Sequence, residues 1–356
     1  VVTLDISARS HTFRRWEEMI DACRPARISS WGKSVKISVI VCTHRRATAL
    51  SMCLESLSRQ NFPPLDYEVI VVNNASPDSQ AYQEIGGVIS RAFEQYFGSD
   101  ATRMKRIDCP VPGLSIARNT ALAVARGEVV SFVDDDVRVD LNWLSLLWQA
   151  FQNHPEAAVI GGKIILVEPE VKPWWYRAYW RRFWGHFDPP YPAFTLVQHW
   201  QDFPWGGNWA ARRHALLEIG GFRSRYGRRG NQLIGGEEII AASQLHKSGF
   251  QVGIEPKAVV YHHVESSRFR LGYVIRSVQS SRRTWYQLQK EGYIAWELGF
   301  RPSMRRIFNA LVLFRQESFF KFPFTVFAEI SACFWMLGDL VQRMKKPLAL
   351  SVLRRR

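Results

Sequence analysis

The stretch "EVVSFVDDDVRVD", residues 128–140, places three consecutive carboxylates at the end of a short apolar run. The β-branched and aromatic residues at 129–133 are typical of a buried strand. Asp134, Asp135 and Asp136 follow where that strand is expected to end. Carboxylates this close repel one another and raise one another's pKa, so the sequence predicts that cationic groups lie beside them.

Two more buried strands are predicted upstream, from the apolar runs "VKISVIVCTHRR" at 35–46 and "YEVIVVNNASPDS" at 67–79. The spacing of apolar residues predicts helices at 47–60, 115–127 and 141–154. Strands that alternate with helices in this way indicate a three-layer α/β fold, with a mainly parallel sheet between two layers of helices.

Polar residues cluster at the ends of these predicted strands. Parallel α/β sheets bind their ligands in the crevice beyond the carboxyl ends of the strands. The residues that the pattern brings to this edge are Thr43, His44, Asn73, Asn74 and the carboxylates of 134–136. The sequence therefore predicts that this edge of the sheet carries the functional site.

The composition indicates a folded protein with an anionic partner. Hydrophobic residues make up 47% of the 356 residues, which is enough for a sizeable core. The net charge of +15 at pH 7 favours a phosphorylated substrate, lipid headgroups or nucleic acid as that partner. The five cysteines are dispersed and include no C-x-x-C pair, which favours a reducing compartment over a disulfide framework.

Three segments differ in character along the chain. Residues 1–34 form a lead-in without clear periodicity, and residues 35–265 hold the α/β pattern in two halves, 35–140 and 141–265. Residues 266–356 are basic, aromatic and helical in pattern, and the part after residue 300 has eleven Lys and Arg against three acidic residues. We expect this last segment to be amphipathic and to associate with a membrane.

The aromatic segments leave two alternatives open. Residues 319–346 contain no clean apolar run of ~18 residues and so make a poor transmembrane span. An amphipathic helix lying among anionic headgroups fits better, and a helix packed on the main domain is the alternative. The Trp-rich stretch 173–192 either packs on the sheet or meets a sugar or lipid. These patterns predict a cytoplasmic protein, peripheral on the cytoplasmic face of a membrane.

The acidic cluster has the residues of a metal site. One or two carboxylates are the usual protein share of a Mg²⁺ or Mn²⁺ site, and water and substrate phosphate supply the rest. Asp134 and Asp136 lie two residues apart at a strand end, so both can face the crevice. The alternative is a solvated turn before the next helix, although Asp140 is better placed to cap that helix.

A second acidic pair, Glu237 and Glu238, begins a predicted helix in "LIGGEEIIAASQLHKSG" at 233–249. Carboxylates are favoured at a helix N-terminus by the helix dipole, so a purely structural role is one reading. In the other reading, one of the two takes a proton from a substrate hydroxyl.

The ordered motifs resemble those of the family 2 glycosyltransferases, which have the GT-A fold. The resemblance covers about residues 35–264, and six matching motifs in the family's order make it specific. The motifs are "SVIVCTHRR", "VIVVNNASPD", "GLSIARNTALAVARGEVVSFVDDD", "GGNWAARRHALLEIGGF", "GGEE" and "VVYHHV".

The resemblance implies an inverting, metal-dependent transfer of a sugar from a nucleotide diphosphate to a hydroxyl. Asp136 and Asp134 would bind Mn²⁺ or Mg²⁺. One of the two histidines at 262–263 would complete the metal site, and strand alternation favours His262. Glu238 would be the catalytic base, with Glu237 beside it as a possible orienting residue.

The resemblance also implies a nucleotide-sugar pocket and an acceptor wall. The family often has Asp where this chain has Asn, so a UDP- or dTDP-sugar is favoured and a GDP-sugar stays possible. The acceptor would be a glycan or a lipid-linked sugar in polysaccharide or glycolipid biosynthesis. Arg118 would neutralise phosphate or hold the base-binding loop, and its alternative role is an ordinary helix-face cation. The implied pocket residues are Thr43, His44, Arg45, Asn73, Asn74, Arg118, Asp134 and Asp135, and the implied acceptor residues are Trp205, Gly206, Gly207, Asn208 and Trp209.

Two other classes of function are alternatives to this one. A nucleotidyltransferase of related fold would normally carry a glycine-rich loop after the first strand, and "CTHRRATAL" has no glycine. A non-catalytic protein that binds nucleic acid or another anionic surface would suit the net charge of +15. The sequence contains no recognisable nucleic-acid reader or zinc motif, so we expect no nucleic-acid partner.

Overall fold

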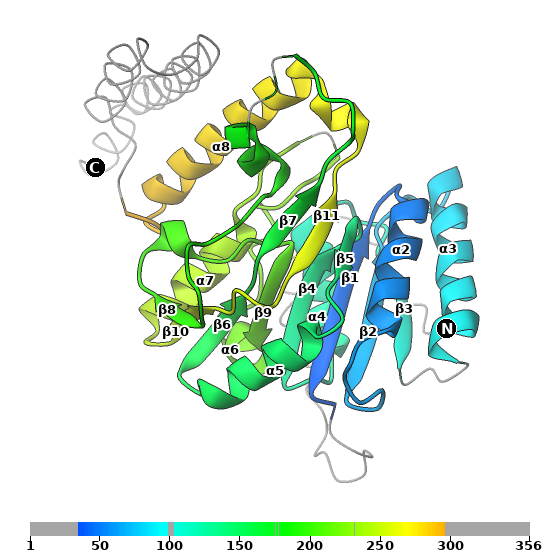
Figure 1. The fold of residues 1–356 in the computed structure, drawn as a ribbon, viewed down its shortest axis with the longest axis horizontal. Coiled ribbons are helices and arrows are strands. Elements are labelled where there is room, and N and C mark those ends of the chain that lie inside the picture. The colour runs from blue at the N-terminus through cyan, green and yellow to red at the C-terminus, as the bar shows by residue number, and fades with distance from the viewer. Residues whose placement is uncertain (1–34, 99–102, 175, 177, 231, 296–356) are drawn as a thin grey trace, which may run out of the picture.

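The computed structural model describes residues 35–98, 103–174, 176, 178–230 and 232–295, and the coloured ribbon of Figure 1 follows them. The predicted lead-in of residues 1–34 and the predicted amphipathic segment at 319–346 lie outside the described residues.

An eight-stranded sheet forms the centre of the molecule (Figure 1), in the order β3-β2-β1-β4-β9-β6-β10-β8. The first four strands in this order run parallel to one another, and β9 lies antiparallel between β4 and β6. This confirms the predicted α/β fold with a mainly parallel sheet. The strands are β1 (Ile37–Thr43), β2 (Tyr67–Asn73), β3 (Met104–Asp108), β4 (Val129–Asp134), β6 (Ala157–Gly161), β8 (Thr195–Val197), β9 (Asn208–Arg212) and β10 (Gln251–Ile254).

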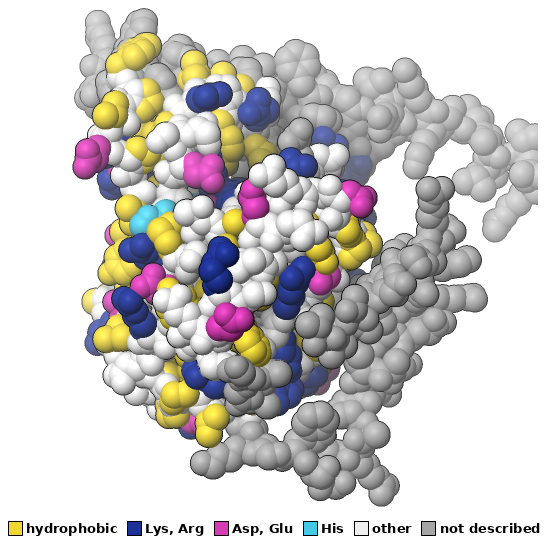
Figure 2. All heavy atoms as spheres, turned by 90° about the vertical axis from the view of Figure 1, so that its right-hand side faces the viewer, with side chains coloured by type: hydrophobic (Ala, Val, Ile, Leu, Met, Phe, Trp, Pro, Cys, Tyr) yellow, Lys and Arg dark blue, Asp and Glu magenta, His cyan; other side chains and the backbone are white. Residues whose placement is uncertain are grey.

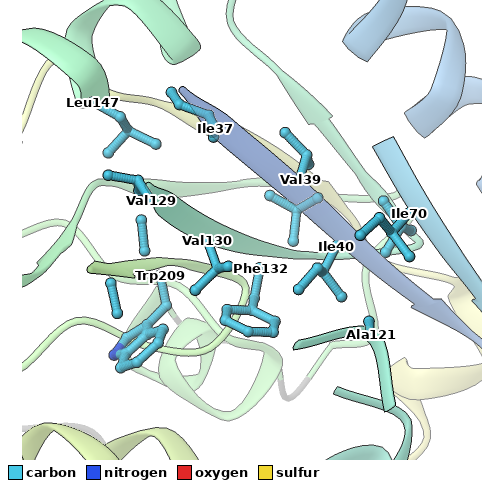
Figure 3. Packing of buried hydrophobic residues seen from close by; sticks show 14 of the residues in the cluster. Ile37, Val39, Ile40, Ile70, Ala121, Val129, Val130, Phe132, Leu147 and Trp209 are labelled. Carbon is cyan, nitrogen blue, oxygen red and sulfur yellow. The ribbon is translucent and has the colours of Figure 1, made fainter. Parts of the chain in front are cut away.

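Helices cover both faces of this sheet, because its strands bury their side chains on both sides. Figure 3 shows Leu147 of α5 on the side of Ile37 and Val129, and Ala121 of α4 on the side of Ile40 and Phe132. The helices are α2 (Ala47–Ser58), α3 (Gln80–Ala92) with the π-helical turn η1 (Phe93–Phe97), α4 (Leu114–Val124), α5 (Trp143–Asn153), α6 (Arg213–Glu218), α7 (Glu237–Lys247) and α8 (Leu271–Lys290).

A second, three-stranded sheet lies beside the first and was not predicted. Its order is β5-β11-β7, with β5 at Val137–Val139, β7 at Ile164–Val167 and β11 at Val260–His263. Only two residues, 135–136, separate β4 of the large sheet from β5 of the small one. The acidic cluster therefore lies where the chain passes from one sheet to the other.

A small aromatic core joins α8 to the segment before β8. The 3₁₀ helix η2 (Ala178–Trp184) buries Trp180 and Trp184, and Trp184 stacks on Phe269 at 4.4 Å between ring centroids. Phe269 ends the 3₁₀ helix η4 (Ser266–Phe269), directly before α8, and a third 3₁₀ helix, η3, spans Trp200–Asp202. For these two tryptophans the structure supports the packing alternative.

Among the described residues, no helix is long and apolar enough to cross a membrane. Figure 2 shows the face that carries α3, where Lys and Arg side chains are interspersed with Asp and Glu. That face does not concentrate the positive charge of the chain.

Candidate functional site

A cleft of about 480 Å³ opens at the carboxyl ends of β1 and β4, where the sequence placed the site. Helices α7 and α8 and the segment after β8 supply its other walls. The structure brings together most of the predicted site residues, and those that line the cleft are Thr43, His44, Asn74, Arg118, Asp134, Asp135, Asp136, Trp205, Gly206, Gly207, Glu237, Glu238 and His262.

The cations expected beside the acidic cluster are two arginines and a histidine. Asp136 Oδ2 lies 2.6 Å from Arg46 Nη1, 3.1 Å from Arg268 Nη2 and 3.2 Å from His262 Nε2. Asp135 accepts hydrogen bonds from Thr43 Oγ1 at 2.7 Å and from Arg46 Nη1 at 3.0 Å. The carboxylates therefore tolerate one another because positive groups from β11, η4 and the β1–α2 turn surround them.

The pKa values of the two buried carboxyls in this cluster, Asp135 and Asp136, are shifted in opposite directions. Burial raises the pKa of Asp135 to about 6, although the Arg46 guanidinium opposes this. Burial also disfavours the charge on Asp136, but His262 and then Arg46 outweigh it and lower the pKa of Asp136 to about 2. Asp136 therefore stays ionised well below neutral pH, whereas Asp135 takes up a proton as the pH falls through about 6.

A tight turn after β1 directs Arg46 toward the cluster. Arg45 has a φ of 76°, in the left-handed region that L-residues other than Gly, Asn and Asp seldom adopt. Its side chain is exposed and does not line the cleft, so its predicted contact with the donor is not seen. The neighbouring Arg46, which the prediction left out, makes the contacts with Asp135 and Asp136.

The two asparagines at the end of β2, Asn73 and Asn74, hold the local backbone. Asn74 Nδ2 donates to Cys109 O at 2.5 Å and to Val111 O at 2.8 Å, and its Oδ1 accepts from Gly113 N at 3.1 Å. Asn73 is fully buried, donates to Tyr82 O and does not line the cleft.

These contacts explain the presence of Asn74. An ionised aspartate cannot donate hydrogen bonds, so it could not hold the two carbonyl groups that the Asn74 amide holds. The expectation that Asn73 reaches the nucleoside is not supported, because its side chain is enclosed beneath the turn.

Arg118 connects the two acidic groups across the cleft. Its Nη1 donates to Glu237 Oε1 at 2.9 Å, its Nη2 donates to Gly206 O at 3.0 Å, and Nη2 lies 3.8 Å from Asp134 Oδ1. Its guanidinium also lies 5.6 Å from the ring centroid of Phe132. Arg118 is therefore a buried organising cation of the site rather than a cation on an exposed helix face.

The two glutamates of α7 have different environments. Glu237 is buried and paired with Arg118, and its second oxygen, Oε2, has no hydrogen-bond partner among the described residues. Glu238 is half-buried and lines the cleft. Burial first, and then the neighbouring Glu237, raise the pKa of Glu238 to about 8. Glu238 is thus the better proton acceptor of the two at mildly alkaline pH.

Two glycines allow the acceptor-side segment to approach these groups closely. A Cβ at Gly206 would lie 2.9 Å from Arg118 Nη2, and one at Gly207 would lie 3.2 Å from Asp134 Oδ2. Larger residues would push the segment away from both charged groups. Trp205 also lines the cleft, where its ring stacks on Phe187 at 5.7 Å.

The remaining two predicted acceptor residues are core residues, which corrects the prediction. Trp209 is only 1% exposed and packs on Phe132, its register partner in β4, as Figure 3 shows. Asn208 is fully buried, and its Oδ1 accepts a hydrogen bond from Trp143 Nε1 at 2.9 Å. Both lie in β9, a central strand that leaves neither side chain free to contact a sugar.

The two histidines of β11 have different environments, and the preference for His262 as a metal ligand stays a prediction. In β11, His262 is buried and contacts Asp136, whereas the backbone N–H of His263 donates to Asp136 O at 2.9 Å. The residues that sequence reasoning missed come from the turn after β1, from the α6–α7 connection and from the segment after His262. They include Arg46, Arg228, Arg268 and the α8 residues Tyr273, Ser281, Thr284 and Trp285.

The residues around Asp136 fit a divalent cation. The Oδ1 atom of Asp136 is buried and has no hydrogen-bond partner among the described residues, which leaves one coordinating oxygen available. No group of three His, Cys, Asp or Glu side chains in the described part of the chain could enclose a metal. Two protein ligands, Asp136 and His262, still match the usual share in sites where phosphate and water complete the shell.

Comparisons with known proteins match the chain to glycosyltransferases. The sequence model described as "Glycosyl transferase family 2" matches residues 38–220, about half of the chain. A glucosyl-dolichyl phosphate glucuronosyltransferase of Haloferax volcanii is 23% identical over 252 residues, 68% of this chain and 73% of the relative. The succinoglycan biosynthesis protein ExoM of Rhizobium meliloti is 27% identical over 262 residues, 73% of this chain and 77% of the relative.

Among solved structures, the mannosyltransferase PcManGT from Pyrobaculum calidifontis, in complex with GDP-Man and Mn²⁺, shares the fold. The TM-score is 0.53 at 17% identity, with 92% of this chain and 86% of that one covered. The fold and the cleft thus define a GT-A-like glycosyltransferase. The chain belongs to glycosyltransferase family 2.

Proposed function

We propose that this glycosyltransferase moves one sugar from a nucleotide diphosphate sugar to a hydroxyl acceptor, with inversion at the anomeric carbon. The observation that carries the proposal is that the acidic cluster at 134–136 and the glutamate pair at 237–238 line one cleft and are joined through Arg118. Glu237 pairs with Arg118 at 2.9 Å, and Glu238 beside it is left to face the cleft.

Glu238 is the proposed catalytic base. Its carboxylate takes the proton of the acceptor hydroxyl as that oxygen attacks the anomeric carbon. A new carbon–oxygen bond forms while the bond from the anomeric carbon to the diphosphate breaks, and this single displacement inverts the configuration. The pKa of Glu238 of about 8, raised by burial and by Glu237, suits proton transfer near neutral pH.

The diphosphate end of the donor is assigned to the acidic cluster. Asp136 and His262 would hold Mn²⁺ or Mg²⁺, with Asp134 at the edge of the same cleft. When bound there, the ion would stabilise the negative charge that develops on the leaving diphosphate. Arg46 and Arg268 add positive charge at the same place, because both contact Asp136.

The base assignment is tested with two matched variants, Glu238→Gln and Glu237→Gln. Glu238→Gln is expected to bind the donor like the wild type but to lose transfer, because an amide cannot accept the proton. Glu237→Gln is expected to keep measurable transfer, with a weakened Arg118 contact. Sugar transfer and nucleotide binding are measured separately, and full turnover by Glu238→Gln would move the base role away from that residue.

The metal assignment is tested with Asp136→Asn. We expect this change to abolish Mn²⁺-dependent thermal stabilisation by nucleoside diphosphates, since a ligand that binds only the folded state raises the melting temperature. Asp78→Asn, at an exposed position away from the cleft, is the control. Manganese-dependent stabilisation that survives in Asp136→Asn would refute the metal site.

We favour a UDP- or dTDP-sugar as the donor, and comparing UDP, dTDP and GDP in the same thermal assay tests this choice. GDP is the competing outcome because the Pyrobaculum structure contains GDP-Man. The acceptor proposed is a glycan or a lipid-linked sugar. The name of the Haloferax relative, which acts on glucosyl-dolichyl phosphate, supports the lipid-linked form.

Peripheral binding to an anionic membrane is proposed from a surface beside the cleft. Val171 is 88% exposed, Trp174 is 75% exposed and Leu271, at the start of α8, is 42% exposed. The ring contact between Tyr176 and Phe269, 5.8 Å between centroids, brings these two segments together. Exposed apolar side chains gathered in one region mark a surface that meets another apolar phase.

Basic side chains accompany this surface, since Lys172 and Arg270 are both exposed. Anionic headgroups attract such residues, so salt-sensitive binding to vesicles of phosphatidylglycerol and phosphatidylcholine is expected. Trp174→Ser should weaken that binding, while Leu65→Ser, at an exposed leucine in the α2–β2 connection, should not. Equal binding by both variants would exclude the surface around Trp174.

A further inference from the structure

We propose that helix α8 forms the acceptor-sugar subsite of the cleft and that the hydroxyl of Thr284 binds an acceptor hydroxyl. This inference rests on the proposed function and names which side chains select the acceptor. Thr284 lies 64 residues beyond the end of the family match at residue 220.

The Thr284 hydroxyl is buried without a partner. The residue is 3% exposed and lines the cleft, and its Oγ1 has no hydrogen-bond partner among the described residues. A buried hydroxyl left without a hydrogen bond costs about 1–3 kcal/mol. Because Thr284 lines the cleft, a ligand hydroxyl that enters there could complete this bond.

Thr284 is held next to the catalytic pair. Its Cγ2 would lie 3.0 Å from a Cβ placed at Gly236, and Leu288, one turn further along α8, would lie 3.1 Å from that position. Gly236 is the N-cap of α7 and directly precedes Glu237 and Glu238. Thr284 therefore packs against the residue that directly precedes the two glutamates, and both Thr284 and Glu238 line the same cleft.

The same face of α8 has the chemistry of a sugar site. Tyr273, Ser281, Thr284 and Trp285 all line the cleft, and residues three or four apart on a helix share one face. Trp285 is fixed against Trp200, with ring centroids 5.2 Å apart. Hydroxyl groups pair with sugar hydroxyls, and flat aromatic rings cover the apolar face of a sugar ring.

The test compares the full chain with Thr284→Val, Thr284→Ser and the control Ser243→Ala. Valine keeps the shape that packs on Gly236 and removes only the hydroxyl. Ser243 is also buried with an unpartnered hydroxyl, but it lies further along α7 and does not line the cleft. The acceptor probes are the p-nitrophenyl glycosides of glucose, galactose, mannose and N-acetylglucosamine.

Thr284→Val is expected to raise the acceptor KM about two- to tenfold, the loss that one neutral hydrogen bond of ~0.5–1.5 kcal/mol predicts. The donor KM and the slow hydrolysis of donor without acceptor should stay unchanged. Thr284→Ser should restore the acceptor KM, and Ser243→Ala should leave it unaltered. Thr284→Val should melt no lower than the wild type, because the hydroxyl has no hydrogen-bond partner in the described part of the chain.

Two results would overturn the subsite. One is an unchanged acceptor KM in Thr284→Val, or a rise in the donor KM instead. The other is a wild type that hydrolyses the nucleotide sugar but transfers to none of the four glycosides. A wild type that neither binds nor hydrolyses any nucleotide sugar would instead refute the proposed function, and the subsite with it.

Discussion

Replacing Asn74 by aspartate is the sharpest test of how the donor end of the cleft is built. The Asn74 amide donates hydrogen bonds to the carbonyls of Cys109 and Val111, at 2.5 and 2.8 Å, and so holds the loop before α4. Aspartate has nearly the same shape, so the change alters the hydrogen bonds and the charge with little effect on packing. The loop residues Pro112 and Gly113 line the cleft, which links this change to ligand binding.

The expected cost follows from these contacts. Losing two hydrogen bonds costs about 1 kcal/mol each, and leaving two carbonyls beside a buried carboxylate adds about 1–3 kcal/mol. The free energy of unfolding should therefore fall by about 3–5 kcal/mol, a large part of the 5–15 kcal/mol typical of a domain. Urea unfolding at pH 7.5 measures the loss, and stabilisation by nucleoside diphosphates should weaken in parallel.

The pH dependence separates this account from a general loss of packing. Facing two carbonyls disfavours the charged form, so the pKa of the new carboxyl is raised above its value in the unfolded chain. The loss in the free energy of unfolding should consequently be small below the pKa that the new carboxyl has in the unfolded chain. It should grow as the pH rises through the pKa that this carboxyl has in the folded protein. Asn142→Asp is the control, because the Asn142 side chain only accepts, from Asn61 Nδ2 at 3.0 Å. An Asn74→Asp protein as stable as the wild type at pH 7.5 would refute the reasoning.

Three further outcomes are expected. Transfer by the wild type should fall as the pH drops below about 8, because the raised pKa of Glu238 leaves the base protonated there, and a flat kcat/KM profile from pH 6 to 9 would contradict this. Arg45→Asn should raise the free energy of unfolding by up to about 1 kcal/mol in urea, because Asn tolerates the φ of 76° better; a loss would argue against strain at this turn. Arg118→Met should lower the free energy of unfolding by about 3–5 kcal/mol in urea, because it leaves Glu237 buried without its partner. The double variant Arg118→Met with Glu237→Gln should recover most of this loss, and a double variant whose loss is the sum of the two single losses would speak against the pair.

The sequence was sufficient for three neighbouring strands of the large sheet, β2, β1 and β4, and for the place of the cleft, because those features are local. An apolar run that ends in carboxylates predicts both a strand and its polar edge, and Asp134 lies where that pattern placed it. The alternation of side chains along a strand was also enough to favour His262 over His263. Both predictions depend only on neighbours in the chain.

The errors came from contacts between distant residues. The family resemblance implied that Asn208 and Trp209 belong to the acceptor wall, but both lie in β9, which is inserted between β4 and β6 and buries every side chain. Asn74 carries no sequence signal for its two carbonyl partners, which lie 35 and 37 residues away. Arg268, the partner of Asp136, is 132 residues from it.

Site residues fall both inside and beyond the family match, and the proposed base and the proposed acceptor hydroxyl lie beyond it. Asp134, Asp136 and Arg118 fall inside the family match at 38–220, and the Asp136 end of the cleft is the proposed diphosphate site. Glu238 and Thr284 come from α7 and α8, after that match ends. Because Thr284 packs directly on Gly236, substitutions on α8 should affect the proposed base and the bound acceptor while they leave the Asp136 end of the cleft unchanged. Acceptor choice should therefore change through α8 while the nucleotide preference stays the same.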